Sequence, residues 1–153
     1  MADVLALGGK VGNPVKISAV PDSTFATEIA ALITAGTYVV GKLVGLTWSA
    51  NYQVTSPAED AIPDGRIVGY EKTTSASGNS YILDVELFHY TDQNGNGHTP
   101  VCIQEIDYDG SLALQDSVIC YDTAYRAVDD GGTGGWGAVI ALDTTNSKAH
   151  VLF

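Results

Sequence analysis

Short apolar runs alternate with turn-forming residues along most of the chain. Runs rich in β-branched and aromatic residues are separated by Gly, Asp, Asn, Ser or Pro. This rhythm, with a turn signal roughly every eight to twelve residues, is typical of all-β sandwiches and barrels. It predicts strands at residues 14–20, 37–48, 66–71, 80–91, 99–108, 117–121, 137–142 and 149–153.

The clearest alternation lies within the predicted strand at 80–91. Leu83, Val85 and Leu87 share one face, and Asp84 and Glu86 point to the other, because successive side chains of a strand point to opposite sides. We therefore expect a half-buried strand of an antiparallel sheet, with the two carboxylates on a solvated outer face. An acid/base pair is the alternative interpretation of these carboxylates.

One segment, 23–35, shows helical spacing instead. Its apolar positions recur three and four residues apart: Phe25, Ile29, Leu32 and Ile33. Asp22 can cap the start and Gly36 can end the segment. The pattern predicts one short helix, and a further strand is the alternative because residues 34–40 are β-prone.

Two segments, 49–63 and 127–135, are polar or rich in glycine and are predicted to be loops. Residues 1–13 are predicted to be an N-terminal arm, followed by a single β-rich domain at 14–153. The apolar residues Val151, Leu152 and Phe153 predict a docked C-terminus, either in the chain's own sheet or against a neighbouring subunit. Trp136, beside several glycines, either fills a partner's pocket or packs on the chain's own core.

Composition and charge narrow the possible partners. The 153 residues fit one folded domain, with 45% hydrophobic and 16% charged residues. A formal net charge of −11 without a basic cluster repels nucleic acid and anionic lipid, so we expect neither as a partner. We find no signal-peptide pattern at the start and no apolar window long enough to span a membrane, and we expect synthesis in the cytoplasm.

Cys102 and Cys120 do not have metal-site spacing. They flank a predicted turn at Asp109-Gly110 and could face one another across a hairpin. Free buried thiols are the favoured interpretation over a disulfide.

Few residues suggest a metal-binding, cofactor-binding or catalytic site. Asp92, Asn94 and Asn96 match the first half of a calcium-binding loop, but position twelve is Ile103 where a glutamate is needed. A hairpin loop rich in Asn and Gly explains the same residues. The glycines at 132–137 have the spacing of a dinucleotide-binding fingerprint, but the sequence predicts neither the buried strand that should precede it nor the helix that should follow it. We therefore expect no cofactor, no metal and no enzymatic activity.

Three segments of the first half resemble the capsid decoration, or head cement, proteins of tailed bacteriophages. They are Gly12-Asn13-Pro14-Val15-Lys16, Ala35-Gly36-Thr37-Tyr38-Val39-Val40-Gly41 with Val44-Gly45, and Pro63-Asp64-Gly65-Arg66-Ile67-Val68-Gly69-Tyr70. The resemblance implies a small β-barrel or β-tulip core, and it covers the stretch from Gly12 to Tyr70. From Ser75 onwards the chain carries no matching motif.

The resemblance also implies a function. It implies a structural protein on the exterior of a virion, a homotrimer that binds the major capsid protein and clamps neighbouring capsid subunits together. In this interpretation the arm binds the capsid through its apolar residues Val4, Leu5, Leu7 and Val11, by adding a strand to a capsid edge. Trp136 and the C-terminal residues 151–153 are candidates for the interface.

Three other interpretations remain open on the sequence. A phage tail, fibre or baseplate component has the same β-rich character. A carbohydrate-binding module could use Trp48, Trp136 and the tyrosines as stacking platforms. A small hydrolase would need His89 or His98 beside a carboxylate in a cleft.

Overall fold

The computed structural model describes residues 11–12, 15–47, 53–57, 62–88, 90–91, 97–98, 102–109, 112–121, 126–129 and 135–153. The described part is mainly antiparallel β-structure with one helix, α2 (Ser23–Thr34), as the sequence predicts. Its strands form several sheets, and no closed barrel is present among the described residues.

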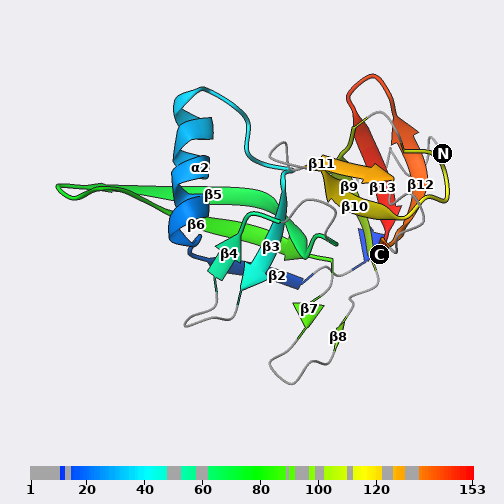
Figure 1. Cartoon of the computed structure of the whole chain (residues 1–153), viewed down its shortest axis with the longest axis horizontal. Helices are drawn as coiled ribbons and strands as arrows, with labels where there is room; N and C mark the ends of the chain where they lie inside the picture. Colours follow the sequence, from blue (N-terminus) through cyan, green and yellow to red (C-terminus); the bar gives the residue numbers. More distant parts are fainter. Residues whose placement is uncertain are drawn as a thin grey trace.

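The first lobe is built on a five-stranded sheet in the order β2-β6-β5-β3-β4. Figure 1 shows this sheet with α2 standing against it. The helix begins where Asp22 Oδ1 accepts a hydrogen bond from the Phe25 N–H at 2.8 Å, as the capping prediction requires. The strands are β2 (Val15–Ala19), β3 (Leu43–Thr47), β4 (Gln53–Thr55), β5 (Gly65–Ser75) and β6 (Gly78–Leu87).

The second lobe contains most of the C-terminal half. A four-stranded sheet runs in the order β1-β9-β13-β12, and β10 pairs with β11 beside it. The strands are β1 (Val11–Gly12), β9 (Cys102–Asp107), β10 (Val118–Tyr121), β11 (Arg126–Asp129), β12 (Ala138–Asp143) and β13 (Lys148–Leu152). A further short pair, β7 (Tyr90–Thr91) and β8 (Gly97–His98), lies below both lobes in the view of Figure 1.

Each lobe has its own cluster of buried side chains. The first cluster joins α2 to the sheet and includes Phe25, Ile29 and Leu83, none of which has exposed surface. The second lies between the sheets of the C-terminal lobe and includes Ile106, Val118 and Val151. The alternation predicted for 80–91 is confirmed on its inner face, where the core residues follow the spacing of a half-buried strand.

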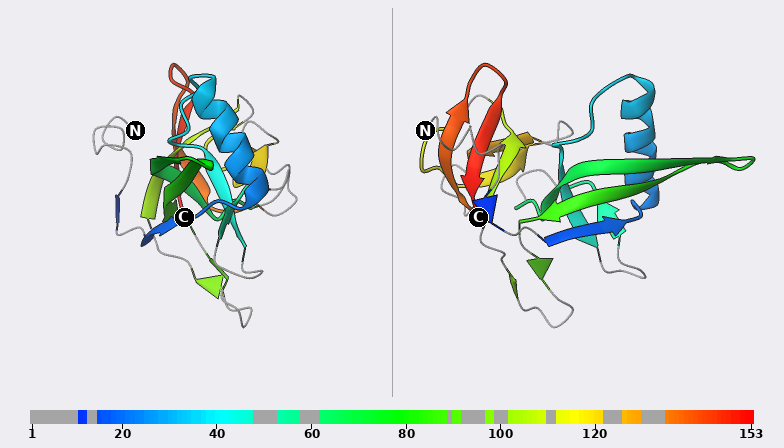
Figure 2. Two further views of the ribbon diagram at one scale, coloured as in Figure 1. Left: turned by 90° about the vertical axis from the view of Figure 1, so that its left-hand side faces the viewer. Right: turned by 180° about the vertical axis from the view of Figure 1, so that it is seen from behind.

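The lobes are tied together by residues that leave one lobe and pack in the other. Leu43 begins β3 of the first sheet but belongs to the second cluster. Phe88 directly follows β6 and stacks on Phe153, with ring centroids 4.1 Å apart and an interplanar angle of 4°. Figure 2 shows the two lobes side by side, with the C-terminus near their junction.

The positions of the cysteines exclude one arrangement that the sequence left open. Cys102 lies in β9 opposite Gly12, whereas Cys120 lies in β10 opposite Ala127. The two strands belong to different sheets, so the cysteines do not face one another across a hairpin.

Candidate protein-binding surface

A long two-stranded hairpin dominates the surface of the first lobe. β5 and β6 pair from Gly65 and Leu87 out to a turn closed by Ser75 and Gly78. All residues from 70 to 80 are exposed. Figures 1 and 2 show the hairpin projecting well beyond α2 and away from the second lobe. Its distal half therefore presents its surface to solvent rather than to its own chain.

Among the described strands, none pairs with the outer edge of β5 or of β6 in the distal half of this hairpin. β2 pairs with β6 only as far as Ala19 opposite Leu83. On the other side, β3 pairs with β5 only at Gly65 and Arg66. Within the described part of the chain, residues 69–75 and 78–82 thus each form a free strand edge. Such an edge is a template for pairing with another chain.

A groove of about 370 Å³ lies beside the free edge of β6. Its walls come from the two residues that follow β2, the middle of α2 and the distal part of β6. The lining residues are Val20, Pro21, Ala26, Thr27, Ala30, Asn79, Ser80 and Tyr81. None of these side chains carries a charge at neutral pH, and the two alanines leave room beside the strand.

Exposed apolar side chains lie close to this edge. Val20 is 53% exposed, Ile82 is 42% exposed and Tyr70 is 40% exposed. The ring of Tyr70 lies 6.5 Å from that of Tyr81, which is only 6% exposed. These apolar side chains and the groove thus form an uncharged, partly apolar surface on a strongly acidic protein.

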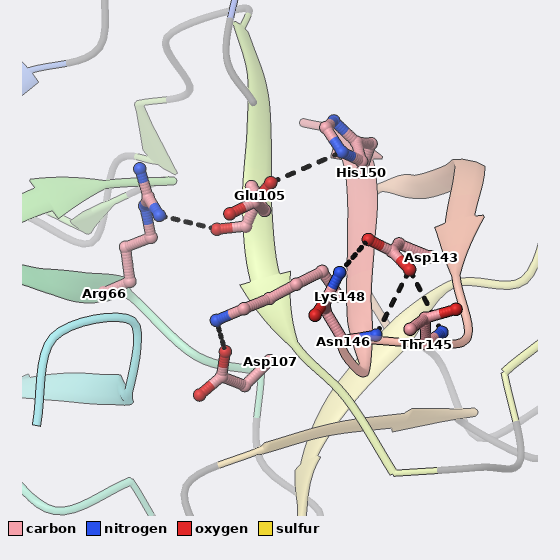
Figure 3. Close-up of polar contacts among 8 residues, drawn as sticks. All are labelled: Arg66, Glu105, Asp107, Asp143, Thr145, Asn146, Lys148 and His150. Atoms are coloured by element: carbon pink, nitrogen blue, oxygen red, sulfur yellow. Dashed lines mark hydrogen bonds and ion pairs between the residues drawn. The ribbon is translucent and has the colours of Figure 1, made fainter. Parts of the chain in front are cut away.

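The base of the hairpin contains an ion pair that the sequence did not predict. Glu86 is only 3% exposed and lies 3.3 Å from Arg66 Nη2, directly opposite it in the sheet. This corrects the expectation of a solvated outer face. Arg66 also donates to the backbone oxygen of Glu105 at 2.6 Å, which joins β5 to β9 (Figure 3). The second lobe covers this part of the face, so the carboxylate is enclosed.

A histidine and a carboxylate do meet, but at neither predicted position. His150 Nε2 lies 3.5 Å from Glu105 Oε2, and Figure 3 shows the two side chains facing one another from β13 and β9. His150 is fully buried, and among the described residues neither ring nitrogen has a hydrogen-bond partner. Because solvent does not reach the imidazole, this pair does not form an accessible acid/base site.

The hairpin turn between β12 and β13 holds the carboxylate of Asp143 in place. The side chain and backbone of Asn146 and the backbone of Thr145 donate hydrogen bonds to Asp143 (Figure 3). These bonds, led by that from the Asn146 side chain, lower the pKa of Asp143 below its ordinary value. The nearby Lys148 pairs with Asp107 of β9. These contacts stabilise the second lobe and are not arranged around a cleft.

The C-terminal candidates for the interface lie mostly inside the second lobe. β13 is an inner strand between β9 and β12, so the terminus docks in the chain's own sheet, which is one of the two predicted alternatives. Val151 has no exposed surface and Phe153 is 7% exposed, so neither is available to a partner. Leu152, at 41%, points outwards. Trp136 is partly buried and packs against the second cluster.

Other predicted site residues are less fully described. Val4, Leu5 and Leu7 lie outside the described residues, while the backbone of Val11 pairs with Ile103 in the β1–β9 ladder. The calcium candidates Asp92, Asn94 and Asn96 and the histidine His89 also lie outside. His98 lies in β8. Among the described residues, no group of three or more His, Cys, Asp or Glu side chains could hold a metal ion.

No helix in the described part of the chain has the length and apolar character needed to cross a membrane. Comparison with known proteins found no matching family model, no similar curated protein and no similar solved structure. The interpretation of the surface therefore depends on its own geometry and chemistry.

Proposed function

We propose that this chain is a structural protein of a tailed bacteriophage, which binds the exterior of the assembled capsid as a homotrimer and holds neighbouring capsid subunits together. It is not an enzyme in this proposal. The supporting observation is the projecting β5–β6 hairpin, which has two edges that no other described strand pairs with and an uncharged groove beside its β6 edge. A surface of this kind suits pairing with other protein chains.

The resemblance of the stretch from Gly12 to Tyr70 to head decoration proteins supports the capsid as the particular partner. Strong net negative charge keeps such a protein soluble at high concentration until it binds. Many copies binding one particle, each supported by its neighbours in a trimer, multiply a modest affinity per contact.

Two observations argue against the carbohydrate-binding module and the hydrolase as alternative functions. Trp136, a proposed sugar-stacking platform, packs partly buried against the second cluster. In the one histidine–carboxylate pair among the described residues, solvent does not reach the imidazole of His150, which does not suit a hydrolase. A tail or fibre component remains the main competitor because it would use the same kind of surface.

The direct test is co-sedimentation with phage particles. The purified protein is mixed with undecorated heads, and separately with tails, of the phage that encodes it. We expect the protein to sediment with heads, to saturate at a fixed number of copies per capsid subunit and to raise the temperature at which the heads rupture. Recovery with tails alone, or in neither pellet, would reject the capsid assignment.

The proposed contact of the arm has its own test. A variant lacking residues 2–10 keeps β1, because Val11 and Gly12 form that strand. We expect this variant to retain its circular dichroism spectrum and to lose head binding. The quadruple substitution Asp3→Ala, Ala6→Ser, Gly8→Ala and Gly9→Ala is the control, since it keeps Val4, Leu5 and Leu7. Full occupancy of the heads by the truncated variant would show that the arm does not bind the capsid.

A further inference from the structure

The distal β5–β6 hairpin is an unusual element for a chain that acts alone. A two-stranded hairpin is at best marginally stable in water unless further strands or a helix cover it. Here the described residues supply no strand beside residues 69–75 of β5 or beside residues 78–82 of β6. With respect to the described strands, the hairpin therefore has two unpaired edges in the same part of the molecule.

The register of the β5–β6 ladder shows which backbone N–H and C=O groups point away from the hairpin. The pair that closes this two-residue turn, Ser75 and Gly78, exchanges backbone hydrogen bonds within the hairpin. Because hydrogen-bonded pairs alternate along an antiparallel ladder, every second residue directs its N–H and C=O outwards. The outward-directed residues are Asn79 and Tyr81 on β6, and Tyr70, Lys72 and Thr74 on β5.

We propose that these two edges pair with each other between copies of this chain, so that β5 of one copy adds to β6 of the next. The inference rests on the trimer of the proposed function and names its contact surface. When the hairpins of a ring all point the same way, β5 of one copy runs antiparallel to β6 of its neighbour. A contact between two different surfaces of this kind closes into a ring when the rotation per copy allows it.

Charge favours a second copy as the occupant of the β6 edge. Two molecules of net charge −11 repel one another over most of their surfaces. The hairpin carries no charged residue from Thr73 to Leu83, and the groove beside β6 is lined by uncharged side chains. Two copies can thus approach here without bringing carboxylates together.

The incoming β5 strand carries a side chain, Tyr70, whose position suits the groove beside β6. Tyr70 lies opposite Leu83 in the β5–β6 ladder, so it is on the same face of the hairpin as the core side chains and α2. In a continuous sheet, Tyr70 of the incoming β5 would lie on the α2 side of the neighbour's β6. There the small side chains of Ala26 and Ala30 line the groove and leave space for a ring.

The test uses a proline on each edge, in the full-length protein. Asn79→Pro and Thr74→Pro each remove an N–H that points away from the hairpin, where proline is tolerated in an edge strand. We expect the wild-type protein to have the mass of three chains by analytical ultracentrifugation. Each proline variant should associate about tenfold more weakly or worse, because it loses a backbone bond and places its ring against the neighbour.

The matched controls are Asn79→Ala and Thr74→Ala. Both remove the bond from Thr74 Oγ1 to Asn79 Oδ1, which is 2.9 Å long, but both keep the backbone N–H. They should remain trimeric. Circular dichroism and thermal unfolding of all four variants separate a loss of association from a loss of fold.

Mixing the two proline variants makes the test specific. The Asn79→Pro copy keeps its β5 edge and the Thr74→Pro copy keeps its β6 edge, so an equimolar mixture should form a dimer with one intact contact. Folded variants that both remain trimeric would overturn the edge pairing and leave capsid binding untouched. A trimeric Thr74→Pro beside a monomeric Asn79→Pro would also overturn it, because the trimer would then form without the β5 edge. A monomeric wild-type protein would reject the trimer itself, and head binding is scored separately by co-sedimentation.

Discussion

At the scale of single residues, the contact between Arg66 and Glu86 shows how a charged pair can hold the two lobes together. The side chains are only 14% and 4% exposed. Removing charges from water is costly, so a buried carboxylate has to be held by its partners. Arg66 contacts both Glu86 and the backbone of Glu105, and thus connects the hairpin base to the second lobe.

Arg66→Met is expected to lower the free energy of unfolding by about 3–5 kcal/mol, because it leaves the buried Glu86 without the charge opposite it. Urea unfolding at one fixed protein concentration measures this loss. Lys148→Met is the control: the Lys148–Asp107 pair is 30% and 24% exposed, and its loss should cost less than about 1 kcal/mol. Equal small losses in both variants would contradict the assigned role of Arg66.

The lowered pKa of Asp143 predicts a dependence of stability on pH. The folded state favours the carboxylate form, so this contribution is present above the ordinary pKa of 3.8 and is lost as the pH falls through the lower folded value. Asp143→Asn should therefore lower the melting temperature at pH 7, and the difference from the wild-type protein should shrink at pH 3 and below. A difference that stays constant across this range would show that the hydrogen bonds of Asn146 do not stabilise the ionised form.

At the scale of elements, the sequence predicted the helix and the turns whose conformation is determined by residues close together in the chain. Helix α2 has its apolar spacing, its cap at Asp22 and its terminating Gly36, and it begins where predicted. The turn at 144–147 closes the β12–β13 hairpin, in which Asp143 lies opposite Lys148, and its backbone donates to Asp143. In each case residues close in sequence fix the geometry.

Strands whose own residues are polar or lack apolar alternation were missed or cut short. β4 lies in the predicted loop at 49–63, because its pairing with β3 compensates for a polar sequence. β11 likewise overlaps the predicted loop at 127–135 and pairs with β10. β5 was expected to end at residue 71 but continues to Ser75, through threonines and serine without apolar alternation. The length of the hairpin, and with it the candidate surface, was therefore not predictable from periodicity.

Two glycines with the same backbone angle allow a test of packing at the start of β12. Gly36 and Gly137 both have φ of 74°, where an alanine costs about 1–2 kcal/mol. A Cβ at Gly36 meets nothing within 4 Å, but one at Gly137 lies 2.7 Å from Val151 Cγ1. Gly137→Ala should therefore destabilise the protein clearly more than Gly36→Ala in urea unfolding. Equal losses would mean that β13 can move to make room.

At the scale of the whole molecule, two lobes with separate cores share side chains across their junction. Leu43 and Phe88 belong to chain segments of the first lobe, yet they pack in the second cluster. The junction also explains why Glu86 is buried although its strand alternates: Arg66, opposite Glu86 in the sheet, donates to the backbone oxygen of Glu105 in the second lobe, so this end of the outer face lies at the contact between the lobes. Only the three-dimensional arrangement of the lobes could show this.

The C-terminal residue gives the sharpest test of this junction. Phe153 stacks on Phe88, which directly follows β6, so its ring links the end of the second lobe to the base of the hairpin. Phe153→Ala should lower the free energy of unfolding by about 3–5 kcal/mol, as for other buried aromatic side chains. The neighbouring Leu152 is 41% exposed, and Leu152→Ala should have a much smaller effect. Unfolding followed by tryptophan fluorescence and by far-ultraviolet circular dichroism, at one protein concentration, measures both variants. If the two substitutions have equal small effects, the terminal ring does not hold the lobes together, and the coupling must come from Arg66 and Leu43.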